Sequence, residues 1–255
     1  MKILNKIIII VVLVACLYAT FLIASDVSKI SEKISSFKIE FLPIIISLVT
    51  SGWFILFARW HLLLKNSKIF IPKKDNLVIF FSSFALAVIP GKMGDLIKSQ
   101  LLKTKFGIPR SRTVPIVMLE QLYTVIGLVF LSFFGIWYFE LGTYVIGFFT
   151  ALLVFVFILI SSRKTFNKMV LLLGKWKYTS KFVEPLSSSY DTIKTSIKGP
   201  MVFYASALTA IFWLIEAIVV YFLLLSFGID SIEFLKVIPT YTTSLMLGFL
   251  SFLPM

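Results

Sequence analysis

The stretch FFSSFALAVIPGKMGDLIKSQLL, residues 80–102, decides how the chain folds, because its apolar part is too short to cross a membrane. The apolar run that it completes, Leu77–Ile89, has ~13 residues, which give roughly 20 Å of helix at 1.5 Å per residue. A full crossing needs about 20 residues and 30 Å. The run ends at a Pro-Gly pair, and charged residues follow at helical spacing, namely Lys92, Asp95 and Lys98.

The rest of the chain contains longer apolar runs. It has 255 residues, of which 59% are hydrophobic, and its mean hydropathy is +0.99, well above the usual composition of a soluble domain. The sequence therefore predicts an all-α, polytopic transmembrane helix bundle, built as a single domain over residues 1–255. We expect about six full spans, at residues 7–23, 41–64, 114–138, 144–160, 201–227 and from 234 onward. The first run also resembles a cleavable signal sequence, but its length favours a span.

Loop charges predict the topology. With the N-terminus in the cytoplasm, the basic loops 65–76 and 161–199 lie inside, and the acidic turns 139–143 and 228–233 lie outside. This assignment works only if the short apolar run does not cross. We therefore predict a re-entrant hairpin around residues 77–98, which enters and returns on the cytoplasmic side with Pro90-Gly91 at its tip. The alternative is a short, tilted span with a proline kink.

The formal charge of +13 is more typical of cytoplasmic loops in a membrane protein than of nucleic-acid binding. One cysteine, Cys16, and one histidine, His61, make neither a disulfide framework nor a zinc site, and no cofactor is indicated. We expect His61 to be interfacial and the five tryptophans to include interface anchors. An apolar face stepping through Phe182, Leu186, Tyr190, Ile193 and Ile197 predicts an amphipathic helix at 181–198 on the inner membrane surface.

The charges after the hairpin tip predict an anion site. Pro90 ends the incoming helix, Gly91 allows a sharp turn, and an outgoing helix that begins near Lys92 would point its free N–H groups into the membrane. Such a helix start beside Lys92 and Lys98 is suited to a phosphate. Asp95, in the first turn, can hold a lysine in place.

Three further ionisable residues lie inside predicted spans, where charge is costly and usually faces a cavity or a partner. Glu120 and Glu216 are candidates for an intramembrane acidic role. Each could instead pair with a buried basic group, and Glu120 could lie at the interface. Arg59 could extend to the membrane surface or join the anion site with Lys92.

Several of these features together resemble a known family. They are PGKMGDLIKSQLL at 90–102, the turn Gly107–Pro109, and VMLEQL at 117–122. The chain resembles the transmembrane domain of lysylphosphatidylglycerol synthases, a flippase-like family of integral membrane proteins. The resemblance implies functional roles for residues of the cluster, which are Pro90, Gly91, Lys92, Gly94, Asp95, Lys98 and Glu120. The family usually has a second Pro-Gly hairpin, so the end at Leu253-Pro254-Met255 suggests a C-terminal truncation.

The resemblance implies a lipid as the anion. We expect a lipid translocase or carrier in the cell membrane, not an enzyme, that takes an anionic phospholipid or a polyprenyl-phosphate-linked precursor. Lys92, Lys98 and Arg59 would hold the headgroup, and Glu120 and Glu216 would shape the cavity or couple it to protons. One alternative is a scaffold that recruits a soluble lipid-modifying or glycosyl transferase through residues 161–199. Another is an enzyme acting on a lipid phosphate, for which the sequence offers no paired carboxylates.

Overall fold

The computed structural model describes residues 20, 35–86, 94–135, 140–175, 187, 190, 191, 193, 194, 197 and 199–251. Within this part the chain forms eight α-helices and no strand, which confirms the all-α class. The helices are α3 (Leu42–Asn66), α4 (Lys73–Ser82), α5 (Leu96–Phe106), α6 (Arg110–Ser132), α7 (Glu140–Ser161), α8 (Arg163–Gly174), α10 (Pro200–Ser226) and α11 (Phe234–Ser251).

Four helices are long and apolar enough to cross a membrane, and they lie at residues 39–66, 110–132, 142–160 and 200–226. They match four of the predicted spans, so the chain is a multi-pass membrane protein by composition. The predicted total of six is not reached within the described residues. The run at 7–23 lies almost wholly outside them, and the run from residue 234 forms α11, which is not among the four. The predicted truncation also lies outside, at residues 252–255.

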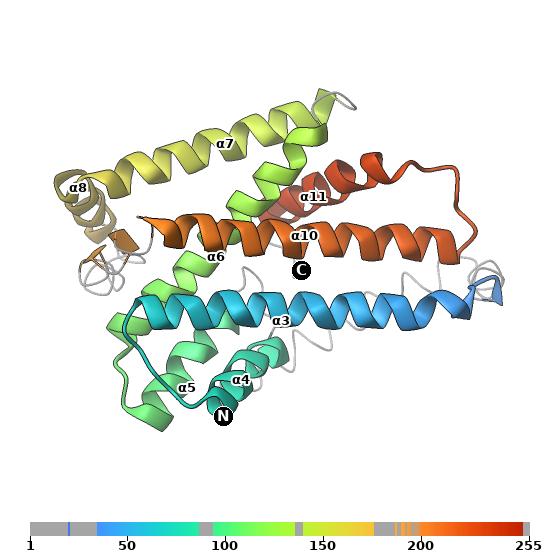
Figure 1. Ribbon diagram of the computed structural model, residues 1–255. Coiled ribbons are helices and arrows are strands. Elements are labelled where there is room, and N and C mark those ends of the chain that lie inside the picture. Colours follow the sequence, from blue (N-terminus) through green and yellow to red (C-terminus); the bar gives the residue numbers. More distant parts are fainter. Residues whose placement is uncertain are drawn as a thin grey trace.

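Helices α3 and α10 lie side by side and antiparallel, with α6 packed against α10 and crossing behind the pair (Figure 1). The backbone N–H of Lys38, just before α3, donates to the carbonyl of Ser226 at the end of α10, at 2.8 Å. Helix α6 also contacts α5, α7 and α11. This central position of α6 places its residues within reach of most of the bundle.

Helices α4 and α5 pack against each other, and α4 ends and α5 begins within the sequence stretch 80–102. Lys105 near the end of α5 forms an ion pair with Asp75 near the start of α4, with Nζ 2.6 Å from Oδ1. The entry and exit of this helix pair therefore lie together, as a re-entrant hairpin requires. The chain then turns at Gly107, whose positive φ of 66° suits glycine, and continues into α6.

The helix pair is longer than the predicted hairpin at 77–98. Its first helix begins at Lys73, and a short 3-10 helix, Phe84–Leu86, follows it. The second helix begins at Leu96, after a 3-10 turn that contains Gly94 and Asp95, and not near Lys92. The predicted tip, Pro90-Gly91, lies in the segment 87–93, outside the described residues.

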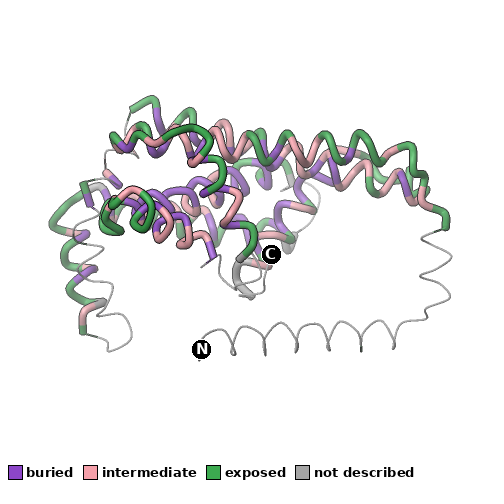
Figure 2. Tube along the Cα trace, turned by 90° about the horizontal axis from the view of Figure 1, so that it is seen from below, coloured by how far each residue is buried: buried purple, intermediate pink, exposed green. Residues whose placement is uncertain are grey.

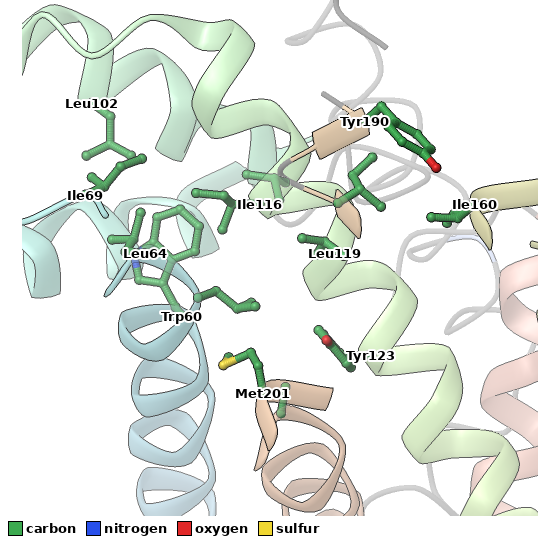
Figure 3. Packing of buried hydrophobic residues seen from close by; sticks show 14 of the residues in the cluster. Trp60, Leu64, Ile69, Leu102, Ile116, Leu119, Tyr123, Ile160, Tyr190 and Met201 are labelled. Atoms are coloured by element: carbon green, nitrogen blue, oxygen red, sulfur yellow. The ribbon is translucent and has the colours of Figure 1, made fainter. Parts of the chain in front are cut away.

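The larger core cluster joins the C-terminal end of α3 to α4, α5 and the first half of α6. Trp60, Leu64, Ile116 and Leu119 are all at most 1% exposed and contribute to this core, which Figure 3 shows. Tyr190 joins it, at 1% exposed, from the predicted amphipathic segment. Tyr190 and Ile193 are therefore buried against protein, whereas a helix on the inner membrane surface would turn its apolar face to lipid; most of 181–198 is not described.

The outer faces of the long helices are apolar. Figure 2 shows exposed residues along their outward sides. These include Phe54 at 52% exposed, Phe155 at 56% and Phe203 at 73%. A surface this apolar is suited to hydrocarbon, whereas the buried side of the bundle holds polar side chains, which are costly in lipid.

Helices α6 and α10 approach closely at Gly127. A Cβ atom at this position would lie 2.7 Å from Cγ2 of Thr209 and 3.2 Å from its backbone carbon. Small residues allow such close contact between membrane helices. Only glycine fits here without moving the neighbouring backbone.

We predict that Gly127→Ala destabilises the protein, because the added methyl group forces α6 and α10 apart. Overpacking of this kind costs about 1–3 kcal/mol. Thermal unfolding of the purified protein in detergent measures it. Gly147→Ala is the matched control, since nothing lies within 4 Å of a Cβ at Gly147 in α7. Alanine is also the better helix former. Equal unfolding temperatures for the two variants would contradict the close approach.

We predict that cysteines at Lys74→Cys and Thr104→Cys react with a membrane-impermeant thiol reagent from the same side of reconstituted vesicles. Both variants carry Cys16→Ala to remove the native thiol. The reason is that the Asp75–Lys105 contact holds the two ends of the helix pair together. Glu233→Cys, in the acidic turn, should react from the opposite side. Labelling of positions 74 and 104 from opposite sides would contradict the re-entrant hairpin.

Candidate functional site

A cavity of about 220 Å³ lies between α3, the α4–α5 pair, α6 and α10. Its lining combines four ionisable residues with aromatic and hydroxyl side chains. The lining residues are Leu56, Arg59, Phe80, Ser83, Phe84, Gly94, Asp95, Lys98, Glu120, Gln121, Thr124, Phe212 and Trp213. Helix α5, which follows the Pro-Gly pair, therefore forms part of the cavity wall.

Lys98 and Glu120 form the central ion pair of this cavity. Nζ of Lys98 donates to Oε2 of Glu120 at 2.6 Å, and both side chains are 3% exposed. Asp95, three residues earlier in the turn that precedes α5, lies 3.3 Å from the same ammonium group through Oδ1. The ammonium also lies 4.8 Å from the ring centre of Trp60 and 5.5 Å from that of Phe80. These partners replace the water that a buried ammonium group has lost.

Arg59 on α3 provides the second buried cation, at 4% exposed. Its Nη1 donates to Oγ1 of Thr209 at 2.9 Å and of Thr124 at 3.3 Å, and its Nη2 lies 3.9 Å from Oε1 of Glu120. Each threonine hydroxyl donates its own hydrogen to a backbone carbonyl four residues earlier. Their lone pairs are therefore free to accept from the guanidinium.

Nε of Arg59, which is a donor, and Oε1 of Gln121, which is an acceptor, lie at the cavity and have no hydrogen-bond partner among the described residues. The amide nitrogen of Gln121 donates to Oδ2 of Asp95 at 2.7 Å, so the carboxylate of Asp95 is engaged at both oxygens. Buried polar groups are usually satisfied. The two open atoms are therefore places where a polar ligand could bind.

The cluster lies well inside the helices that carry it. Arg59 is seven residues from the end of α3, Thr209 nine from the start of α10, and Glu120 ten from the start of α6. At 1.5 Å per residue these separations correspond to roughly 10–15 Å of helix. Glu120 is therefore buried inside the bundle and paired with Lys98. Arg59 likewise points inward and does not extend to the surface.

The structure brings together five of the residues that the sequence singled out. Arg59, Gly94, Asp95, Lys98 and Glu120 all line the cavity. The other three hairpin candidates, Pro90, Gly91 and Lys92, lie outside the described residues, and their roles stay predictions. The ammonium group of Lys98 contacts the carboxylates of Asp95 and Glu120, so its described contacts are with the cavity's own side chains.

Glu216 lies apart from this cluster. The hydroxyl of Tyr241 donates to its Oε2 at 3.4 Å, and the carboxylate faces Gly52 of α3 beside Phe212. No lysine or arginine of the described residues forms an ion pair with it. The alternative that Glu216 pairs with a buried basic group is therefore not seen in the described part of the chain.

The sequence did not single out several residues that complete the cavity. Thr124 and Thr209 bind Arg59, Gln121 binds Asp95, and Trp60 lies against Lys98. Trp60 is fully buried, and its indole N–H donates to Oδ1 of Asn76 at 2.8 Å, so it is not an interface anchor. Thr124 follows Glu120 by four residues, a helical spacing that marks a shared face. No comparable sequence signal indicated Thr209.

The fold and the cavity define a multi-pass α-helical membrane protein with an ion-paired polar site among its long helices. The chain belongs to the family described as lysylphosphatidylglycerol synthase TM region, whose family model matches residues 4–255. This confirms the resemblance seen in the sequence. No curated protein and no solved structure matches the chain.

We predict that Glu120→Gln destabilises the protein by about 3–5 kcal/mol, because it leaves two buried cations with less compensating charge. Denaturant unfolding in detergent measures the change. Glu233→Gln is the matched control, since that carboxylate is 67% exposed and pairs only at the surface with Lys236. A double variant, Lys98→Gln with Glu120→Gln, should lose less than the sum of the single variants. Strict additivity would contradict a direct coupling between the two side chains.

Proposed function

We propose that this protein is a membrane-embedded lipid translocase or carrier, which binds the phosphate-bearing headgroup of an anionic phospholipid or lipid-linked precursor. The observation that carries this proposal is the open Nε–H of buried Arg59 in a cavity inside the bundle. A guanidinium group is well suited to bind a phosphate oxygen, and charge-assisted hydrogen bonds are the strong ones.

Membership of the family supports the lipid as ligand. The helix pair α4–α5 supports an approach of the headgroup from the cytoplasmic side, because the loops at its two ends carry the basic residues. We place the N-terminus and these loops in the cytoplasm. A part for Lys92 in binding the headgroup stays a prediction from the sequence.

We further propose that the site binds and moves its ligand without covalent chemistry. Both cavity carboxylates already accept hydrogen bonds or ion pairs: Glu120 from Lys98, and Asp95 from Lys98 and Gln121. A carboxylate acting as a nucleophile or base needs a free oxygen directed at the substrate. Their arrangement supports a role in orienting Lys98 and Arg59.

We predict that Arg59→Gln slows the transfer of headgroup-labelled phosphatidylglycerol across liposomes roughly tenfold or more. A charge-assisted hydrogen bond contributes about 1.5–3 kcal/mol, and 1.4 kcal/mol corresponds to tenfold. Arg59→Lys keeps the charge but lacks the Nε–H, so we expect it to be impaired as well. The assay follows chemical quenching of the labelled lipid in the outer leaflet.

Arg163→Gln is the matched control, because this arginine is 62% exposed at the start of α8. We expect it to transfer lipid like the unchanged protein. Size-exclusion chromatography before reconstitution shows that each variant is folded. Unchanged transfer in both folded Arg59 variants would remove Arg59 from the binding site, and no transfer by the unchanged protein would contradict the translocase proposal.

A further inference from the structure

An aromatic cluster links α3 to the first half of the helix pair. Phe84, in the short 3-10 helix, is its centre: its ring lies 5.8 Å from Trp53, 5.3 Å from Phe80 and 5.5 Å from Phe81. Trp53 also contacts Phe81 at 6.2 Å. We call these four residues the aromatic cluster.

The aromatic cluster reaches from the cavity to the outer surface. Phe80 and Phe84 both line the cavity, and Phe80 is only 2% exposed. Phe84 is 37% exposed and Trp53 is 40% exposed. Phe84 is the only exposed residue among the described residues that line the cavity. The wall of the cavity therefore meets the outside at Phe84.

Much of the remaining described lining is less exposed than Phe84. Phe212 and Trp213 on α10 are 9% and 7% exposed, and Thr124 on α6 is 5% exposed. The side chains of the Lys98–Glu120 ion pair are 3% exposed, and that of Asp95 is 23% exposed. The contact between Trp53 of α3 and Phe84 is therefore the most exposed described part of the wall, where a ligand in the cavity could extend outward.

The outward end of the aromatic cluster lies at the depth of lipid chains. Trp53 is thirteen residues before the end of α3, which corresponds to roughly 20 Å of helix. Tryptophan is usually enriched at the membrane interfaces instead. Around it the outer face of α3 is apolar, with Phe54 at 52% exposed. An apolar surface at this depth meets hydrocarbon.

We propose that the aromatic cluster is a lateral portal, through which the acyl chains of the bound lipid leave the cavity between α3 and the segment around Phe84. This inference rests on the proposed function, because it takes the cavity as the headgroup site. Each CH₂ group of an acyl chain that left hydrocarbon for a polar cavity would lose hydrophobic stabilisation, so the chains stay in hydrocarbon while the headgroup is bound. Phe84 then contacts the lipid where headgroup and chains meet.

The test uses the reconstituted full chain and phosphatidylglycerol that carries a photoreactive diazirine on one acyl chain. Mass spectrometry of the labelled peptides compares the aromatic cluster with Phe203 and Phe148, which are exposed on α10 and α7. We expect excess labelling at Trp53, Phe81 and Phe84. An excess of unlabelled phosphatidylglycerol should remove it, whereas diacylglycerol with the same chains should not, because it lacks the phosphate.

Equal labelling of the aromatic cluster and the two control positions would overturn the portal, since it would show only bulk lipid. Equal competition by diacylglycerol would overturn the link to the headgroup site. In folded Arg59→Gln the excess should be lost, and its persistence would also contradict the proposal. Transport is measured separately, so headgroup-dependent labelling without transport would sustain the portal and reject the translocase.

Discussion

The ion pair between Lys98 and Glu120 is the contact on which the rest of the site depends. It fixes α5, the second helix of the hairpin-like pair, against α6, the helix that contacts most of the bundle. Both side chains are almost fully buried, so neither charge is stable there without the other. Asp95 lies 3.3 Å from the same ammonium group, and Nη2 of Arg59 lies 3.9 Å from the other carboxylate oxygen of Glu120, so both are linked to this pair.

The described cavity residues balance their own charge. Two cations, Lys98 and Arg59, lie among two carboxylates, Glu120 and Asp95. This balance explains how a polar cavity can exist among apolar helices, where an uncompensated charge would be expelled or neutralised. It also leaves the Nε–H of Arg59 as a buried donor without a hydrogen-bond partner among the described residues.

Close helix packing and polar recognition are coupled at α6 and α10. Gly127 allows the two helices to approach at Thr209, and the hydroxyl of Thr209 accepts a hydrogen bond from Arg59. Membrane helices often combine small residues and hydroxyl side chains at their contacts. Here the contact that holds the two helices together also positions the hydroxyl group that accepts a hydrogen bond from the guanidinium.

The sequence by itself determined the helical class, four of the long spans, and the choice of charged residues. Hydropathy is a local property, so it located α3, α7 and α10 within four residues and α6 within six. The cost of charge in lipid pointed to Arg59 and Glu120, and helical spacing after the Pro-Gly pair pointed to Lys98. It did not fix the ends of α4 and α5, where short elements carry weak signals.

The tertiary structure alone decided which groups meet. The pairing of Lys98 with Glu120 joins residues 22 apart, and Arg59 meets Thr124 and Thr209 across separations of 65 and 150 residues. The tertiary structure also buries Trp60, although tryptophan is often a membrane-interface residue, and it leaves Phe84 exposed at the cavity wall. Such contacts depend on how helices cross and how closely they pack, and a pattern along one helix does not encode that.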